Sequence, residues 1–172
     1  MYYFAYGSNM LHARLTRRCP SARAVGIGRL DGWELDFSKT GGDGSGKAVI
    51  FPSDAPGAAV WGVVFTLAKD DCNVLDRIEG RGRGYERADD LAIAAPARDV
   101  PYRAISYIAQ DGHRDGALKP FDWYRDLVLG GARQNALPEA YQAALARFTA
   151  IRDPVPDRPG RLEALAALGA RA

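Results

Sequence analysis

The sequence predicts a single α+β domain. Several segments have the apolar pattern of strands, helical segments lie between and after them, and no segment repeats. With 172 residues and a hydrophobic fraction of 47%, the chain can bury one core without a disulfide or a metal ion. The net charge of +2, with this apolar content, argues against disorder and gives no strong attraction to nucleic acid or an anionic membrane.

The first part of the chain is predicted to consist of strands around one short helix. Gly7-Ser8-Asn9 breaks the first strand, and a short helix follows from Met10, with Asn9 as its N-cap and Pro20 marking its end. A glycine-rich loop, Gly41 to Gly46, separates later strands. The strands expected here are 2–6, two within 25–38 that are joined by a hairpin-type turn at Asp31-Gly32, 48–51 and 58–67.

The second part is predicted to hold three helices and two strands. A helix over 70–78 has Asp70 or Asp71 as its cap and Gly80 as its stop. The two strands cover 85–95 and 102–108. Two amphipathic helices close the domain. The first has an apolar face formed by Phe121, Tyr124, Leu127 and Val128. The second has Pro138 near its first turn and an apolar stripe formed by Tyr141, Leu145 and Phe148. We therefore divide the chain into a domain, 1–150, and a Pro/Ala-rich C-terminal tail, 151–172, that docks on it or frays.

Composition excludes several classes of function. No stretch approaches the roughly 20 apolar residues of a membrane span, and no secretory leader is apparent. Cys19 and Cys72 lack the spacing of metal ligands or of a disulfide framework, so we read them as reduced thiols of a cytoplasmic protein. Because His12 and His113 are the only histidines, a histidine-built metal site is not expected.

Two segments resemble catalytic motifs but lack the required context. Gly41 to Lys47 has the glycine and lysine spacing of a phosphate-binding loop, yet Ala48 stands where Ser or Thr should hold magnesium, and a strand follows instead of a helix. Ser8 and Ser45 lie in glycine-containing turns but not in Gly-x-Ser-x-Gly, and no histidine is clearly placed as their base. A flexible connector and ordinary turns are the better interpretations.

Tyr6-Gly7-Ser8-Asn9-Met10 and the segment around Glu79 carry more information. Successive backbone N–H groups near a helix start can bind an anion, so the first segment suits a small carboxylate, although an ordinary helix cap explains it equally well. Glu79 lies at a helix end, where the helix dipole disfavours negative charge and raises a carboxyl pKa, as a general base near neutral pH requires. A solvated helix-end residue is the alternative, and the many nearby arginines would oppose the shift; they are Arg77, Arg81, Arg83 and Arg87.

Together these segments resemble the γ-glutamylcyclotransferase-like (AIG2-like) family. Tyr6 to Met10 is similar to its Tyr-Gly-Ser-Asn-Leu motif, and Glu79-Gly80 with Tyr85 resembles the segment that holds its catalytic glutamate. Further matches, in order along the chain, are Ala59 to Phe65, Tyr124, Gly131-Ala132 and Leu137 to Tyr141. Phe121 stands where many members have serine, and Ala136 replaces the glycine before Leu137-Pro138, so the leaving-group side of the pocket is expected to differ.

The resemblance implies a small mixed β-barrel flanked by helices and a cofactor-free reaction. In that reaction the α-amine of a γ-glutamyl amide attacks its own γ-carbonyl and releases 5-oxoproline and an amine or amino acid. Glu79 would be the general acid and base, and the substrate-binding residues would be Tyr6, Gly7, Ser8, Asn9, Met10, Tyr85 and Tyr124. No metal, cofactor, nucleic acid or membrane is implied, and the protein would be a monomer or a homodimer.

Two other functions remain open from the sequence. The same fold could be a non-catalytic module that binds a small carboxylate, which would be stabilised by such a ligand without turnover. It could also be a metal-free amidohydrolase, whose product would be glutamate in place of 5-oxoproline.

Overall fold

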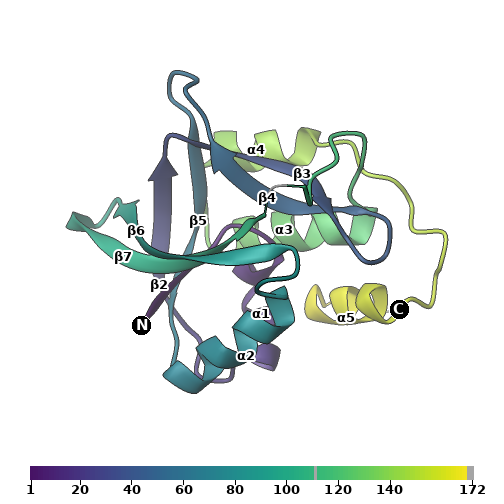
Figure 1. Cartoon of the computed structure of the whole chain (residues 1–172), viewed down its shortest axis with the longest axis horizontal. Helices are drawn as coiled ribbons and strands as arrows, with labels where there is room; N and C mark the ends of the chain where they lie inside the picture. The colour runs from purple at the N-terminus through teal and green to yellow at the C-terminus, as the bar shows by residue number, and fades with distance from the viewer. Residues whose placement is uncertain (111, 170–172) are drawn as a thin grey trace.

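The computed structural model describes residues 1–110 and 112–169, and its centre is a closed five-stranded barrel (Figure 1). The strands follow the order β1-β5-β2-β6-β7 around the barrel. β1 pairs antiparallel with β5 and parallel with β7, so the barrel is mixed, as the resemblance predicted. The barrel strands are β1 (Tyr2–Ala5), β2 (Arg23–Asp31), β5 (Ala59–Thr66), β6 (Tyr85–Ala95) and β7 (Arg98–Ala109).

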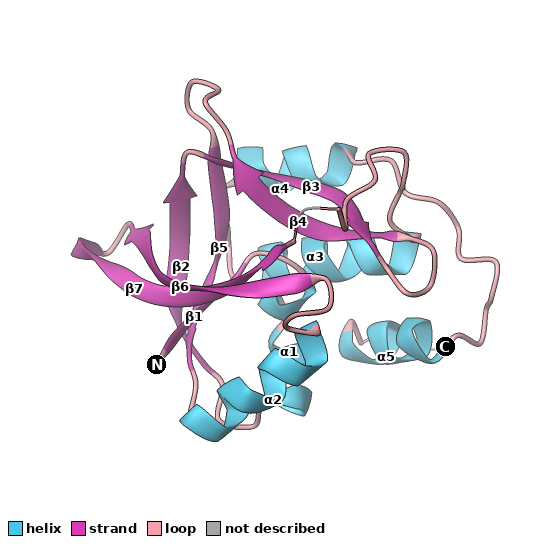
Figure 2. Ribbon diagram, viewed as in Figure 1, coloured by secondary structure: helices cyan, strands magenta, loops and turns pink. Residues whose placement is uncertain are grey.

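Helices and a separate two-stranded sheet flank the barrel (Figure 2). The sheet is β3 (Trp33–Thr40) paired with β4 (Gly46–Pro52). The helical elements are the 3-10 turn η1 (Ser8–Met10), α1 (His12–Arg18), α2 (Lys69–Glu79), α3 (Asp122–Gln134), α4 (Glu139–Arg147) and α5 (Pro159–Ala167). Over the described residues, none of these helices has the length and apolarity needed to traverse a lipid bilayer.

The turn at Asp31-Gly32 is present, but the hairpin predicted around it is not. β2 continues along β5, where Asp31 lies opposite Ala59, whereas β3 leaves to pair with β4. The Gly32 N–H donates to the Ala58 carbonyl, and the Gly32 carbonyl accepts from the Ser53 N–H. Its backbone groups are therefore shared between two partners, and the strands on either side diverge into different sheets.

Two predicted helix caps are also wrong. Asn9 lies within η1 and makes no capping hydrogen bond, and the regular helix starts only at His12. Neither Asp70 nor Asp71 caps α2, which follows Ala68. The Asp71 carboxylate instead accepts hydrogen bonds from the Ser21 N–H and hydroxyl, at 2.7 and 2.5 Å. The side chains of Asn9 and Asp71 both make tertiary contacts, which local capping patterns do not reveal.

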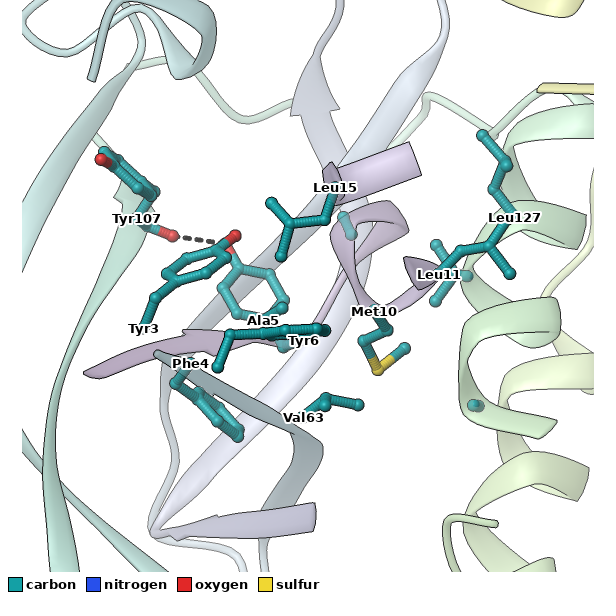
Figure 3. Packing of buried hydrophobic residues seen from close by; sticks show 14 of the residues in the cluster. Tyr3, Phe4, Ala5, Tyr6, Met10, Leu11, Leu15, Val63, Tyr107 and Leu127 are labelled. Carbon is teal, nitrogen blue, oxygen red and sulfur yellow. Dashed lines mark hydrogen bonds between the residues drawn. The ribbon is translucent and has the colours of Figure 1, made fainter. Parts of the chain in front are cut away.

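Close contact between α3 and the turn η1 fixes the segment that follows β1. A Cβ added at Gly131 would lie 2.6 Å from the Met10 Cβ and 2.7 Å from the Leu11 N, so only glycine allows this approach. Met10 is fully buried, and Figure 3 shows its side chain among core residues such as Val63. The turn between β1 and α1 is thus held from behind by the core.

The segment after α4 returns to the domain, and α5 lies against it. The buried Asp153 carboxylate accepts hydrogen bonds from Trp123 Nε1 at 2.8 Å and from Arg158 Nε at 2.7 Å. Glu163 of α5 forms an ion pair with Arg14 of α1 at 3.0 Å. These contacts dock α5 beside α1 and α3, while the predicted domain boundary at residue 150 remains a prediction.

Candidate active site

A pocket of about 320 Å³, counting its open mouth, lies where the first strand, α2 and the barrel meet. Elements far apart in the sequence contribute its lining residues, which are Tyr3, Tyr6, Gly7, Ser8, Asn9, Ala48, Glu79, Tyr85, Tyr107 and Tyr124. The N-terminal turn and the Glu79 segment, separate in the sequence, therefore share one cavity.

The end of α2 fixes the position of Glu79. Gly80 adopts the left-handed conformation, with φ of 68°, and its N–H donates to the Arg77 carbonyl. The Arg81 N–H donates back to the Asp76 carbonyl at 2.9 Å, which completes a Schellman motif. Because glycine adopts this conformation without steric cost, Gly80 ends the helix sharply and leaves Glu79 as its last residue.

The Glu79 carboxylate faces the N-terminal turn. Asn9 Nδ2 donates a hydrogen bond to Glu79 Oε1 at 2.9 Å and another to the Tyr3 hydroxyl at 3.1 Å. The Asn9 amide is itself oriented by Arg18, whose guanidinium donates to Asn9 Oδ1 at 3.3 Å. A single amide thus joins the carboxylate to the turn across the pocket.

Burial raises the pKa of Glu79 above its ordinary value. The positive charges of Arg18, Arg14 and Lys39 and the hydrogen bond from Asn9 act in the opposite direction and limit the rise. A carboxyl group in such surroundings can take up and return a proton nearer neutral pH than an exposed one can.

The arginines close to Glu79 in sequence do not line the pocket. Arg81 and Arg87 both bind the carboxylate of Asp76, at 3.1 and 2.9 Å. Asp76 also accepts a hydrogen bond from the Tyr107 hydroxyl at 2.6 Å, which ties α2 to β7. The cations that act on Glu79 therefore come mainly from α1, through Arg14 and Arg18, and not from the sequence around Glu79.

The turn at Gly7-Ser8-Asn9 lines the pocket and has unused backbone donors. Within the described residues, no backbone carbonyl or side chain accepts from the N–H groups of these three residues, as expected for the start of a helical turn. The Ser8 hydroxyl accepts a hydrogen bond from Arg14 Nε at 3.2 Å. Free N–H groups beside an arginine form a cradle suited to a carboxylate or an oxyanion.

Most of the pocket tyrosines use their hydroxyl groups to hold the walls together. Tyr6 donates to the Tyr107 carbonyl at 2.5 Å, a contact drawn in Figure 3. Tyr85 donates to the Ala48 carbonyl at 2.8 Å, and the Tyr124 hydroxyl accepts from the Ala48 N–H at 3.2 Å. Burial raises the pKa of Tyr6, Tyr85 and Tyr124, so each stays protonated at neutral pH.

The structure brings together every predicted site residue except Met10. Its side chain is buried in the core and does not line the pocket, because the turn directs it toward α3. Sequence reasoning missed Tyr3 and Tyr107, which look like ordinary strand residues. Arg14 and Arg18 were also missed, although their spacing of four places both on one face of α1, which was a usable signal.

No group of three or more metal-ligating side chains is found in the described parts of the chain, 1–110 and 112–169. The chemistry available at the pocket is that of one carboxylate, backbone N–H groups, tyrosine hydroxyls and nearby cations. This set can transfer a proton and stabilise a developing negative charge.

Comparison with known proteins identifies the family. The sequence model of the AIG2-like family matches residues 59–145. Gamma-glutamylcyclotransferase from Homo sapiens is 36% identical over 149 residues, which is 83% of this chain and 76% of the human protein, and the Bos taurus protein is 33% identical over the same shares. A solved structure of a gamma-glutamyl cyclotransferase superposes with a TM-score of 0.84 at 30% identity, covering 96% of this chain and 97% of the other. This chain therefore belongs to the AIG2-like family and is a relative of the mammalian gamma-glutamylcyclotransferases.

Proposed function

We propose that this protein is a γ-glutamyl cyclotransferase in which Glu79 is the general acid and base. The single observation that supports this most is the Glu79 carboxylate facing the Gly7-Ser8-Asn9 turn across one pocket, linked to it through Asn9. The names of its relatives point to the same activity. The substrate would be a small γ-glutamyl amide, and neither a metal ion nor a cofactor takes part.

The reaction begins with proton removal from the substrate. The Glu79 carboxylate accepts a proton from the α-ammonium group, and the freed amine attacks the γ-carbonyl carbon of the same molecule. A C–N bond forms, and the carbonyl oxygen becomes an oxyanion that backbone N–H groups of the turn stabilise. The rigid pocket holds the substrate in a bent conformation, which supplies the entropic part of the rate enhancement.

The second half of the reaction returns the proton. Glu79, now protonated, donates to the leaving nitrogen as the original amide bond breaks and the carbonyl re-forms. The ring nitrogen still carries a second proton after the attack, and it loses this proton to the Glu79 carboxylate, which passes it to the released amine. The products are 5-oxoproline and an amine or amino acid, and the carboxylate is regenerated. Gly7, Ser8 and Asn9 bind the substrate through their N–H groups, whereas Tyr6, Tyr85 and Tyr124 form the walls. Met10 supports the turn from the core.

The test is release of 5-oxoproline from a panel of γ-glutamyl amides. We expect Glu79→Gln to lower kcat/KM about a hundredfold or more, since loss of a general base typically costs that much. Glu139→Gln, which changes an exposed glutamate at the start of α4, is the matched control and should retain activity. Full turnover by Glu79→Gln would refute the assigned role, and glutamate as the product would indicate a hydrolase.

Ligand binding without any turnover would favour the non-catalytic module. In that case a small carboxylate would raise the melting temperature, and no member of the panel would release 5-oxoproline. The proposal also includes a cytoplasmic location, which rests on Cys19 and Cys72 as buried free thiols, and a monomeric or homodimeric state.

A further inference from the structure

Glu163, in the C-terminal helix α5, pairs with both arginines that lie beside the candidate active site. Its Oε1 accepts a hydrogen bond from Arg14 at 3.0 Å and lies 3.6 Å from the Arg18 guanidinium, and α5 lies next to α1 in Figure 1. Across residues 1–110 and 112–169, no other carboxylate lies within 4 Å of either guanidinium. One negative charge from α5 therefore holds two cations of α1.

Each arginine in turn holds one polar residue of the turn that lines the pocket. Arg14 Nε donates to the Ser8 hydroxyl at 3.2 Å, and the Arg18 guanidinium donates to Asn9 Oδ1 at 3.3 Å. Asn9 Nδ2 then donates to Glu79 Oε1 at 2.9 Å. A continuous series of side-chain contacts thus runs from α5 through α1 to the proposed acid and base, although the α5 carboxylate itself does not line the pocket.

The two arginines share a cavity with Glu79. This cavity measures about 480 Å³, counting its open side, and Arg14, Arg18 and Glu79 all line it. The two arginine side chains are only 9% and 19% exposed, so each charge needs a carboxylate nearby. Glu79 is the only carboxylate among the described residues that line this cavity. Without the charge of Glu163, it is the partner that remains for the guanidiniums.

The other groups that face Glu79 do not replace the α5 carboxylate. Lys39 of β3 is a further positive charge that acts on Glu79, and Lys47 of β4 lines the same cavity but is paired with Asp43 at 2.7 Å. The remaining titratable groups around the carboxylate are tyrosines that burial keeps protonated, namely Tyr3, Tyr6, Tyr85, Tyr107 and Tyr124. The charge balance at Glu79 therefore depends on how the α1 arginines are neutralised.

We infer that Glu163 is a positioning residue of the active site, which holds Arg14 and Arg18 against the N-terminal turn and keeps them from pairing with Glu79. This inference rests on the proposed function and adds a residue of α5 that acts on the acid and base through other side chains. Loss of its negative charge should draw a guanidinium toward Glu79. A closer cation favours the ionised carboxylate, so the pKa of Glu79 should fall and the group should accept a proton less readily.

The pH dependence of turnover tests this inference, with γ-glutamyl-alanine as substrate and 5-oxoproline as the measured product. We expect Glu163→Gln, which keeps the shape and removes the charge, to lower kcat/KM at pH 7 about tenfold, because the base is displaced and weakened. The half-maximal point of the acid limb should lie about half a pH unit or more below that of the native protein. Glu163→Asp, which keeps the charge, should restore part of both changes.

Two controls separate the effect of charge from that of packing. Asp157→Asn removes an exposed carboxylate from the segment before α5 and should change neither kcat/KM nor the acid limb. Ala164→Gly weakens the buried face of α5 without changing any charge, so its acid limb should stay at the native pH whatever its activity. A shift confined to Glu163→Gln would therefore support positioning through charge.

A titration that needs no turnover distinguishes the two proposals. The carbon-13 resonance of the Glu79 carboxyl, assigned by its absence from Glu79→Gln, reports the pKa of this group in the native protein and in Glu163→Gln. An unchanged midpoint, or an equal shift in Asp157→Asn, would overturn the role of Glu163 and leave the cyclotransferase function intact. If no γ-glutamyl compound releases 5-oxoproline, the function fails, and a lower midpoint in Glu163→Gln would still support the positioning of the two arginines.

Discussion

Glu79 makes the protein less stable in the charge state that the proposed reaction needs. Burial raises its pKa, so the folded protein binds this proton more tightly than the unfolded chain does. The free energy of unfolding therefore falls as pH rises from the unfolded-state pKa, near 4.3, through the folded-state pKa, and the cost is complete above it. The site carries this cost whenever the Glu79 carboxylate is ionised.

We expect Glu79→Gln to be more stable than the native protein at pH 8 and about equally stable at pH 4, where both side chains are neutral. Thermal unfolding over this pH range measures the difference, which should grow with pH. A difference that does not change with pH would show that the carboxylate is not held in an unfavourable environment. The same samples report activity, so a gain in stability with a loss of turnover excludes misfolding as the cause.

Ala136 has a conformational cost. It has φ of 50°, and its N–H and that of Leu137 donate to the carbonyls of Arg133 and Ala132, so it occupies the left-handed position of a Schellman motif that ends α3. The motif that this segment resembles has glycine at this position, and a Cβ disfavours this conformation by about 1–2 kcal/mol.

We expect Ala136→Gly to raise the free energy of unfolding by about 0.5–1 kcal/mol, since the greater freedom of glycine in the unfolded chain offsets part of the gain. Ala143→Gly, in the exposed middle of α4, is the control and should lower it by about 1 kcal/mol. Chemical denaturation of both variants measures the sign of the change in the free energy of unfolding. Destabilisation by both would contradict the conformational argument.

At the scale of elements, α3 controls the N-terminal turn through Gly131. A methyl group at this position would collide with Met10 and the Leu11 N–H, and α3 cannot move away without losing its own buried face. The N-terminal turn must therefore shift instead, and this turn contains the free N–H groups of the pocket. A substitution in α3, on its core-facing side, is therefore expected to displace the turn that lines the pocket.

We expect Gly131→Ala to lower the free energy of unfolding by about 1–3 kcal/mol and to raise KM for γ-glutamyl substrates more than it lowers kcat. Gly42→Ala is the control, because nothing lies within 4 Å of its added Cβ and its φ is not positive. Steady-state kinetics with thermal unfolding measures both effects. An unchanged KM would show that the turn tolerates the displacement.

For the whole molecule, the segment after α4 is secured by one buried carboxylate. Arg158 lowers the pKa of Asp153 to about 2, chiefly through the hydrogen bonds between them. An acid whose pKa is lowered in the folded state contributes stability that is present above its unfolded pKa, near 4, and is lost as pH falls toward 2.

We expect Asp153→Ala to lower the free energy of unfolding by about 2–3 kcal/mol at pH 7, because Trp123 Nε1 loses its acceptor and Arg158 its partner. The difference from the native protein should shrink between pH 4 and pH 2. Urea unfolding at several pH values measures it, and a constant difference would contradict the assigned role of the charge.

The sequence predicted the fold better than it predicted the site. Periodic apolar segments located most strands and helices, because burial imposes those periods locally, and Gly80 correctly marked the end of α2. The partners of Asn9, Asp71 and Gly32 could not be predicted, since each makes contacts across the fold. The spacing of Arg14 and Arg18 indicates that they share a face of α1, but the sequence does not reveal that this face meets Glu79 once the chain has folded.

The parallel pairing of β1 with β7 has a consequence for how activity arises during folding. Tyr3 lies opposite Ile105 in this pairing, and Arg14 meets Glu163 from a position 149 residues later. Contacts this distant along the chain form late and slowly. In a refolding experiment, turnover should therefore appear with the last kinetic phase, and a ribosome must release nearly the entire chain before the first molecule of product can form.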